Sequence, residues 1–404
     1  MNEQRRRWIQ LLLFVVTLLT TTISGAEWIF GTSIVSGNLG VDEFISGLQY
    51  SIPFLLILTC HEFGHYLVAR YYNIAVTLPS YIPFWLPGFP AIGTMGAYIQ
   101  IKEAIQSRKE YFDVGVAGPL AGFVVAMGFI IYGFSNLPEI DYIYEVHPDY
   151  ESFGKDYPML YEMDTVLYKK DFVNPNRYNF ASMPDSIVYD RESNISITLG
   201  DNLIFWYFEN YWVEDVSRLP HPNEIIHYPF LLAGYLALLF TALNLLPIGQ
   251  LDGGHVIFGL FGERHSRTIA RVLFVVFLFY AGLGVIHPGL LVETSSEASL
   301  QFLLMVALYL YYLYACLYSM IEGRRDRLMV ASIILATQFV TTLLLRTEGY
   351  MGWMVFAFII GRFLGVYHPP VNDNRDLSTT RKIIGVIALV VFILSFSPRP
   401  LIIN

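Results

Sequence analysis

Long apolar runs alternate with shorter polar connections along most of the chain. An apolar helix of about 20 residues is long enough to cross a bilayer, so such runs predict membrane spans. We therefore predict an all-α polytopic membrane protein with about nine transmembrane helices. The predicted spans are residues 8–24, 44–70, 112–134, 229–246, 268–286, 300–320, 329–345, 353–366 and 383–396.

The first run has a second interpretation. Three arginines at positions 5–7 precede it, and it ends in the small residues Ser24, Gly25 and Ala26. A basic start, an apolar centre and a small-residue end are also typical of a cleaved signal peptide. Under either interpretation, the run at 44–70 enters the membrane from outside.

Basic residues recur after every second apolar run. Lys and Arg concentrate on the cytoplasmic side of membrane proteins, so these clusters predict the orientation of the chain. We expect a multi-pass protein of the cytoplasmic (inner) membrane whose active site faces the cytoplasmic side, with a plastid membrane as the alternative. The clusters are Arg5 to Arg7, then Lys102, Arg108 and Lys109, then Arg264, Arg267 and Arg271, then Arg324, Arg325 and Arg327, then Arg381 and Lys382.

One apolar stretch, residues 78–90, contains four prolines and cannot form a continuous helix. Residues 96–102 alternate as in a strand. Together they predict a short re-entrant β-hairpin or loop that is buried against protein near residues 61–65. Its strand edge could pair with an unwound segment of another chain. The alternative is a hairpin that only plugs the helix bundle.

The overall composition excludes an ordinary soluble protein, since 54% of residues are hydrophobic and the mean hydropathy is +0.48. Both cysteines, Cys60 and Cys316, lie in apolar runs, so no disulfide framework is expected. The connection 136–226 carries 17 Asp and Glu against 6 Lys and Arg, which disfavours a nucleic-acid partner.

These features divide the chain into five predicted regions. Residues 1–43 form an N-terminal anchor and external segment, and 136–226 form an acidic extracytoplasmic loop or small domain. The loop ends in an aromatic stretch, 201–212, which could be an interfacial helix or a helix packed within the loop. The catalytic core would comprise 44–135 and 227–262, followed by C-terminal membrane helices at 263–404.

Candidate chemistry begins with the segment His61-Glu62-Phe63-Gly64-His65, which closes an apolar run. Two His four residues apart lie on one helix face and can bind one zinc ion. Zinc lowers the pKa of bound water toward about 7, and Glu62 could then accept a proton from that water. The alternative is a pair of packed or surface histidines, although ionisable groups in an apolar segment are costly unless they are paired or bind metal.

A zinc site needs a third protein ligand, and Asp252 is the best candidate. Asp252 lies shortly after the apolar run at 230–246. Two glycines follow Asp252, and they permit a bend or a close backbone approach. Its alternative role is a helix-cap or turn aspartate. His255 could approach the metal, but a role in orienting a ligand is the preferred interpretation. The remaining histidines at predicted helix edges are interpreted as interfacial residues: His221, His227, His265, His287 and His368.

The ensemble of motifs resembles the site-2 protease family of intramembrane zinc metalloproteases. The resemblance rests on the blocks 61–65, 93–98, 112–122 and 244–253, which occur in the family's order. It implies Zn²⁺ as the cofactor, with His61, His65 and Asp252 as its ligands and Glu62 as the general base. It also implies substrate contacts by Asn244 and by a glycine-bearing re-entrant loop that contains Gly93 and Gly96.

By this resemblance the protein would hydrolyse peptide bonds within transmembrane segments of membrane-anchored proteins, as in regulated intramembrane proteolysis. Its partners would be those segments and membrane lipids. Two alternatives are a metal transporter, which should spread ionisable residues along a pathway through the bilayer, and a catalytically silent receptor with the same fold. The sequence concentrates its ionisable residues in two motifs and keeps all four catalytic positions, which favours the protease.

Overall fold

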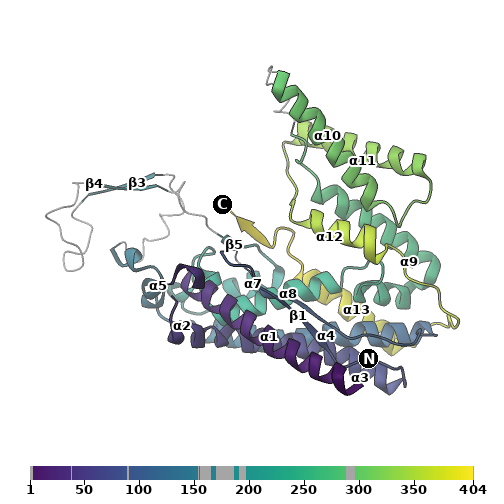
Figure 1. Ribbon diagram of the computed structural model, residues 1–404, viewed down its shortest axis with the longest axis horizontal. Coiled ribbons are helices and arrows are strands. Elements are labelled where there is room, and N and C mark those ends of the chain that lie inside the picture. The colour runs from purple at the N-terminus through teal and green to yellow at the C-terminus, as the bar shows by residue number, and fades with distance from the viewer. Residues whose placement is uncertain are drawn as a thin grey trace.

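The computed structural model describes residues 3–37, 39–88, 91–152, 154, 165–169, 186–190, 197–287 and 296–403. It is predominantly helical (Figure 1). The helices are α1 (Glu3–Phe30), α2 (Val41–Ser46), α3 (Leu48–Tyr71), α4 (Arg108–Ser135), α5 (Asp141–Val146), α7 (Leu203–Tyr207), α8 (Pro229–Asn244), α9 (Asp252–Ala281), α10 (Ser296–Cys316), α11 (Arg324–Leu345), α12 (Trp353–Ile359) and α13 (Thr379–Ser395). The strands are β1 (Ser80–Phe84), β2 (Gly93–Tyr98), β3 (Thr165–Lys169), β4 (Ser186–Asp190), β5 (Ile197–Leu199) and β6 (Leu401–Ile403).

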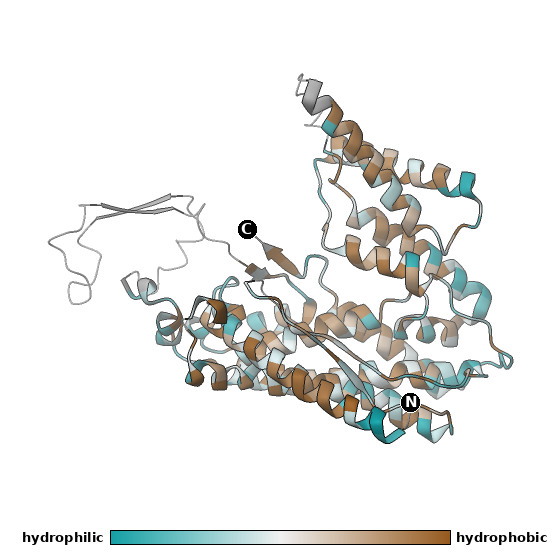
Figure 2. Ribbon diagram, in the orientation of Figure 1, coloured by the Kyte–Doolittle hydropathy of each residue, from teal (hydrophilic) through white to brown (hydrophobic). Residues whose placement is uncertain are grey.

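The centre of the molecule is formed by α3, α4, α8 and the start of α9. Helix α4 contacts the other three, and α8 is buried along nearly its whole length. Helix α1 packs on α3 beside the β1–β2 hairpin, while α10, α11 and α12 group with the later part of α9 (Figure 1). Figure 2 shows that α1 and α10 are hydrophobic along most of their length. Exposed apolar side chains on α1, such as Leu12 and Leu19, fit a surface that faces lipid.

Four helical segments among the described residues are long and apolar enough to cross a membrane: α1, Val41–Tyr71, α4 and α11. Shorter apolar helices occupy Pro229–Asn244, Leu300–Cys316 and Trp353–Leu364. The prediction of about nine transmembrane helices is therefore not confirmed. Most of the apolar run at 268–286 lies in a longer helix, α9, which kinks at Gly262 (φ 73°, ψ 178°) and ends at Ala281.

The predicted hairpin is present. Strands β1 and β2 pair antiparallel, with a register irregularity between Tyr81 and Pro83. The hairpin is fixed to the helices by its backbone, since the carbonyls of Ala91 and Ile92 accept hydrogen bonds from Trp28 Nε1 and the Tyr50 hydroxyl, both at 2.9 Å. Each strand pairs only with the other among the described residues, so the sheet keeps two edges.

The acidic loop is described only in part, and its middle, including 155–164 and 170–185, lies outside the described residues. Strands β3 and β4 pair with each other, and β5 pairs with β6, which brings the C-terminal strand to this loop. The predicted helix at the end of the loop is confirmed as α7 followed by a π-helical turn, Phe208–Trp212. The division of the chain into five regions stays a prediction.

Helix α4 starts with a capping box. The Ser107 hydroxyl accepts a hydrogen bond from the Glu110 backbone N–H, and the Glu110 carboxylate accepts one from the Ser107 N–H. The first residue after the cap, Arg108, is almost fully buried. Its Nε donates to the Gly259 carbonyl at 3.0 Å, and its Nη1 pairs with Asp376 at 2.8 Å. Arg108 therefore joins α4 to the turn of α9 that precedes the kink at Gly262.

A second charged contact ties α13 to α4. Arg381 Nε lies 2.8 Å from Asp113 Oδ1, and the Tyr72 hydroxyl donates to the same carboxylate. Partial burial, with Asp113 as the second cause, raises the pKa of Tyr72 to about 12. The phenol therefore keeps its proton at neutral pH and acts as a donor.

We predict that Arg108→Ala lowers thermal stability in detergent by about 1–3 kcal/mol, because it leaves the buried Gly259 carbonyl without its donor. Asp376→Asn is the matched control. The Asp376 side chain is 78% exposed, so its loss should cost at most about 1 kcal/mol. Equal losses of stability in the two variants would show that the ion pair, not the buried hydrogen bond, is what matters.

Candidate metal centre

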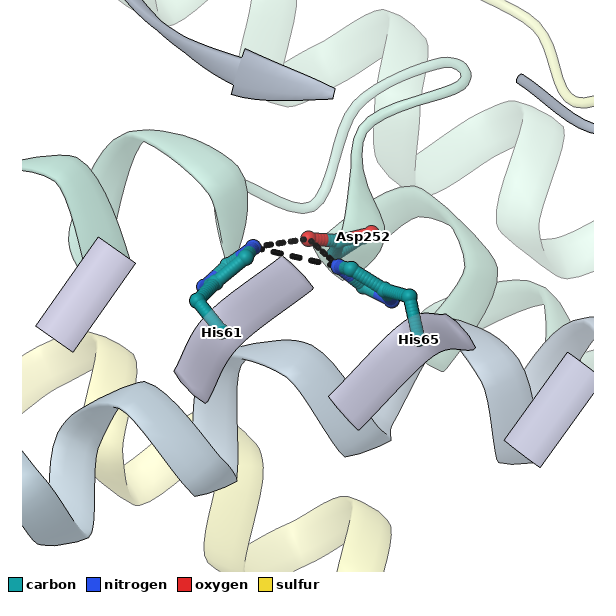
Figure 3. Close-up of side chains that lie close together, drawn as sticks. All are labelled: His61, His65 and Asp252. Carbon is teal, nitrogen blue, oxygen red and sulfur yellow. Dashed lines mark hydrogen bonds and ion pairs between the residues drawn. The ribbon is translucent and has the colours of Figure 1, made fainter. Parts of the chain in front are cut away.

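His61 and His65 lie on the same face of α3, one helical turn apart. Both side chains point toward Asp252, the first residue of α9 (Figure 3). Both histidines are buried, and the Asp252 side chain is 16% exposed. Three potential ligands that are separated by almost 200 residues in sequence therefore meet at one point, as the sequence predicts.

The three ligand atoms are closely and evenly spaced. His61 Nε2 lies 3.1 Å from His65 Nε2, and Asp252 Oδ2 lies 3.5 Å and 3.3 Å from these two nitrogens. Donor atoms bound tetrahedrally at about 2.0–2.2 Å from zinc are themselves about 3.3 Å apart. The spacing of the side chains thus fits one zinc ion with three protein ligands.

Hydrogen bonds also orient the lone pairs toward this point. The Val114 carbonyl of α4 lies 2.8 Å from His65 Nδ1 and accepts its proton, which leaves a lone pair on Nε2. The Asn244 amide nitrogen lies 3.4 Å from His61 Nε2, at the edge of the same place. With the Asp252 carboxylate, three hydrogen-bond acceptors converge in a buried place. Such a set requires a cation or protons, and its chemistry fits zinc.

Glycines of α4 make room for the histidine helix. A Cβ atom at Gly118 would lie 2.1 Å from His65 Nε2, and one at Gly122 would lie 3.1 Å from His61 Cβ. On α3, a Cβ at Gly64 would lie 2.6 Å from the Ala117 carbonyl oxygen. The two backbones can therefore approach closely only because these positions lack side chains.

The connection between α8 and α9 presents Asp252. Gly249 has a φ of 62°, in the left-handed region that favours glycine. The two glycines after Asp252 pack against this connection, since Cβ atoms at Gly253 and Gly254 would lie 2.0 Å and 2.1 Å from the Leu245 and Gly249 carbonyl oxygens. The expectation of a close backbone approach at these glycines is confirmed. Asp252 does begin a helix, but its carboxylate faces the two histidines.

Glu62 is buried beside the three-residue cluster and is not one of its members. The Ile99 backbone, just after β2, lies next to its carboxylate. The predicted hairpin therefore passes the same residue that the sequence indicates as the base. Gly96 (φ 109°) lies in β2. Among the described residues, a Cβ atom at Gly96 would approach only the Phe240 ring, at 4.0 Å. Gly93 instead packs on α1, where its Cβ would lie 2.4 Å from Thr21 Cα.

Near the start of α9 the structure places a histidine that the sequence does not assign to this region. His368 and His227 are both buried, so their interpretation as interfacial residues is wrong. The His368 Nε2 lies 2.9 Å from His255 Nδ1, and its ring stacks on Phe258 at 3.8 Å between centroids. The C-terminal part of the chain thus supports the first turns of α9. No local signal in the sequence indicates this contact, because it joins residues 113 positions apart.

We predict that Gly118→Ala weakens zinc binding by roughly 10- to 100-fold, as for other changes that displace a metal ligand, because the added methyl group would overlap the His65 ring. Gly128→Ala is the matched control on the same helix, since a Cβ there meets nothing within 4 Å. Zinc per chain can be measured by mass spectrometry after purification with a competing chelator. Equal zinc retention in both variants would contradict the proposed close approach.

Comparison with known proteins places these features in a family. The family model of peptidase family M50 matches residues 49–283, which include α4, α8 and most of α3 and α9. No solved structure matches the chain. Similar curated proteins include the probable zinc metalloprotease EGY2, chloroplastic, of Oryza sativa subsp. indica, 23% identical over 75% of this chain and 48% of that protein.

Two further relatives cover shorter stretches. The probable zinc metalloprotease EGY1, chloroplastic, of Oryza sativa subsp. japonica is 27% identical over 54% of this chain and 29% of its own length. The EGY2 protein of Arabidopsis thaliana is 25% identical over 55% of this chain and 30% of its own length. The chain thus spans about half the length of the EGY2 protein of Oryza sativa subsp. indica. The family match extends over more than half of the chain and contains all three residues of the cluster, so the chain belongs to peptidase family M50, the site-2 protease family of zinc metalloproteases.

Proposed function

We propose that this protein is an intramembrane zinc metalloprotease that hydrolyses peptide bonds within transmembrane segments of membrane-anchored proteins. In this proposal His61, His65 and Asp252 hold the zinc ion and Glu62 is the general base. The observation that carries it is the convergence of three acceptor atoms, spaced 3.1–3.5 Å apart, between a membrane-length helical segment and the start of α9.

Zinc bound at this place would polarise the scissile carbonyl and lower the pKa of the attacking water. The side chains of the protein carry the proton transfers. Glu62 would accept the proton of the water and later donate it to the leaving amine, which a carboxylate can do when it lies beside the reacting atoms. Burial of Glu62 beside the hairpin excludes bulk water from this transfer and keeps the carboxylate in place.

The substrate must expose a backbone carbonyl, which a transmembrane helix hides in its own hydrogen bonds. We propose that an unwound substrate segment adds to an edge of the β1–β2 hairpin, which would present its backbone next to Glu62. Gly96 would let the substrate approach this strand closely, and Gly93 would hold the hairpin on α1. Asn244, beside His61, would donate a hydrogen bond to the substrate backbone.

The membrane compartment is part of the proposal. The basic clusters support an active site that faces the side where positive loops concentrate. The curated relatives carry the word chloroplastic in their names, which supports the plastid alternative over the cytoplasmic membrane. In either membrane the partners would be transmembrane segments and lipids, and no nucleic acid.

We predict that Glu62→Gln abolishes cleavage of tagged single-span substrates in detergent, with a loss of about 10²- to 10⁴-fold or more, while zinc content stays unchanged. The matched control is Glu103→Gln, because Glu103 is exposed and lies outside the cluster. The assay compares cleavage within the span and bound zinc for the same preparations.

Two outcomes would contradict the proposal. If Glu62→Gln cleaved as fast as wild type, Glu62 would not be the base. If wild type bound zinc and cleaved no span in a broad substrate panel, while transporting zinc or capturing membrane proteins, the transporter or receptor alternative would replace the protease.

A further inference from the structure

A second cluster of metal-ligating side chains lies at the opposite end of α8 from Asn244. It contains His147, which follows α5, Glu224, which precedes the short 3₁₀ turn Ile225–His227, and His227, which ends that turn before α8. Helix α8 has 16 residues, so its length separates this cluster from the first centre by roughly 24 Å. The second cluster is therefore distinct from the site that the proposed protease function uses.

The ligand atoms of this cluster are spaced like those of the first. Glu224 Oε2 lies 3.4 Å from His147 Nε2 and 3.4 Å from His227 Nε2, and the two nitrogens are 3.2 Å apart. These distances again match the edges of a tetrahedral zinc site, about 3.3 Å. Glu224 is fully buried and the His227 side chain is 4% exposed, while the His147 side chain is 32% exposed and leaves a route for an ion.

The surroundings orient His227 toward the other two residues. The Ile29 carbonyl near the end of α1 lies 3.0 Å from His227 Nδ1 and accepts its proton, so the Nε2 lone pair faces Glu224 and His147. The Tyr142 hydroxyl of α5 donates to the His227 carbonyl at 2.6 Å. Gly31 (φ 61°) lies against both imidazole rings. A Cβ atom at Gly31 would lie 3.3 Å from His227 Cε1 and 3.9 Å from His147 Cε1. The ends of α1 and α5 and the start of α8 therefore meet at the cluster.

We propose that His147, Glu224 and His227 form a second zinc site that joins these three helix ends. Two imidazoles and one carboxylate suit zinc, whereas Ca²⁺ and Mg²⁺ prefer oxygen ligands. A buried carboxylate also needs a cationic partner, and a divalent ion satisfies all three side chains at once. The competing arrangement is a metal-free ion pair in which an imidazolium supplies the charge, and the experiment separates the two.

The test counts zinc in the purified full-length chain in detergent. Wild type is expected to hold two zinc ions per chain. His147→Gln and Glu224→Gln should each hold one, His61→Gln should hold one, and a variant that combines His61→Gln with Glu224→Gln should hold none. His265→Gln is the matched control, since His265 is exposed and, among the described residues, its ring nitrogen lies within hydrogen-bond distance only of the Phe261 carbonyl of its own helix.

Zinc retained at the first centre reports that the His147 and Glu224 variants are folded. If either variant fails to fold, cobalt substitution of wild type and His61→Gln decides the question, because a tetrahedral cobalt spectrum should persist after the first centre is removed. One zinc per wild-type chain that is lost completely in His61→Gln would overturn the second site. Zinc content unchanged by both His147→Gln and Glu224→Gln would overturn it as well. Neither result depends on whether the protein cleaves a substrate.

Discussion

The close approach of α4 to α3 is the constraint on which the rest of the centre depends. Only glycine at position 118 leaves room for the His65 ring, and the same contact lets the Val114 carbonyl hold the ring by its Nδ1 atom. The ring orientation is thus fixed by the packing of two helix backbones, not by a flexible side chain. Because the contact is made inside a buried helix pair, the ligand geometry can exist before any ion arrives, which lowers the entropic cost of binding.

The other parts of the centre extend from this helix pair. Helix α9 brings Asp252 from the far side, supported by Arg108 at its kink and by His368 near its start. The β1–β2 hairpin reaches Glu62 while its backbone is anchored on α1 and α3. In the proposed function, a strand edge beside this centre would hold a substrate backbone that has left its helix.

Local periodicity predicted much of this arrangement. The spacing of His61 and His65 follows from the helix repeat, and the prolines at 78–90 predicted a hairpin in place of a helix. An unpaired carboxylate at Asp252 would be costly, which favours it as the third ligand, and the structure brings it beside both histidines. The kink at Gly262, the burial of His368 and the meeting of His147 with His227 depend on long-range packing, which hydrophobic runs do not encode. The count of nine spans stays unconfirmed, since four helical segments among the described residues are long and apolar enough to cross a membrane.

The central claim is that one zinc ion is held by His61, His65 and Asp252 between α3 and α9. Anomalous diffraction at the zinc absorption edge, from crystals of the full chain, tests it most directly. The account predicts a peak about 2.0–2.2 Å from His61 Nε2, His65 Nε2 and the Asp252 carboxylate. An active, zinc-containing preparation whose anomalous peak lies away from these three residues would contradict the account.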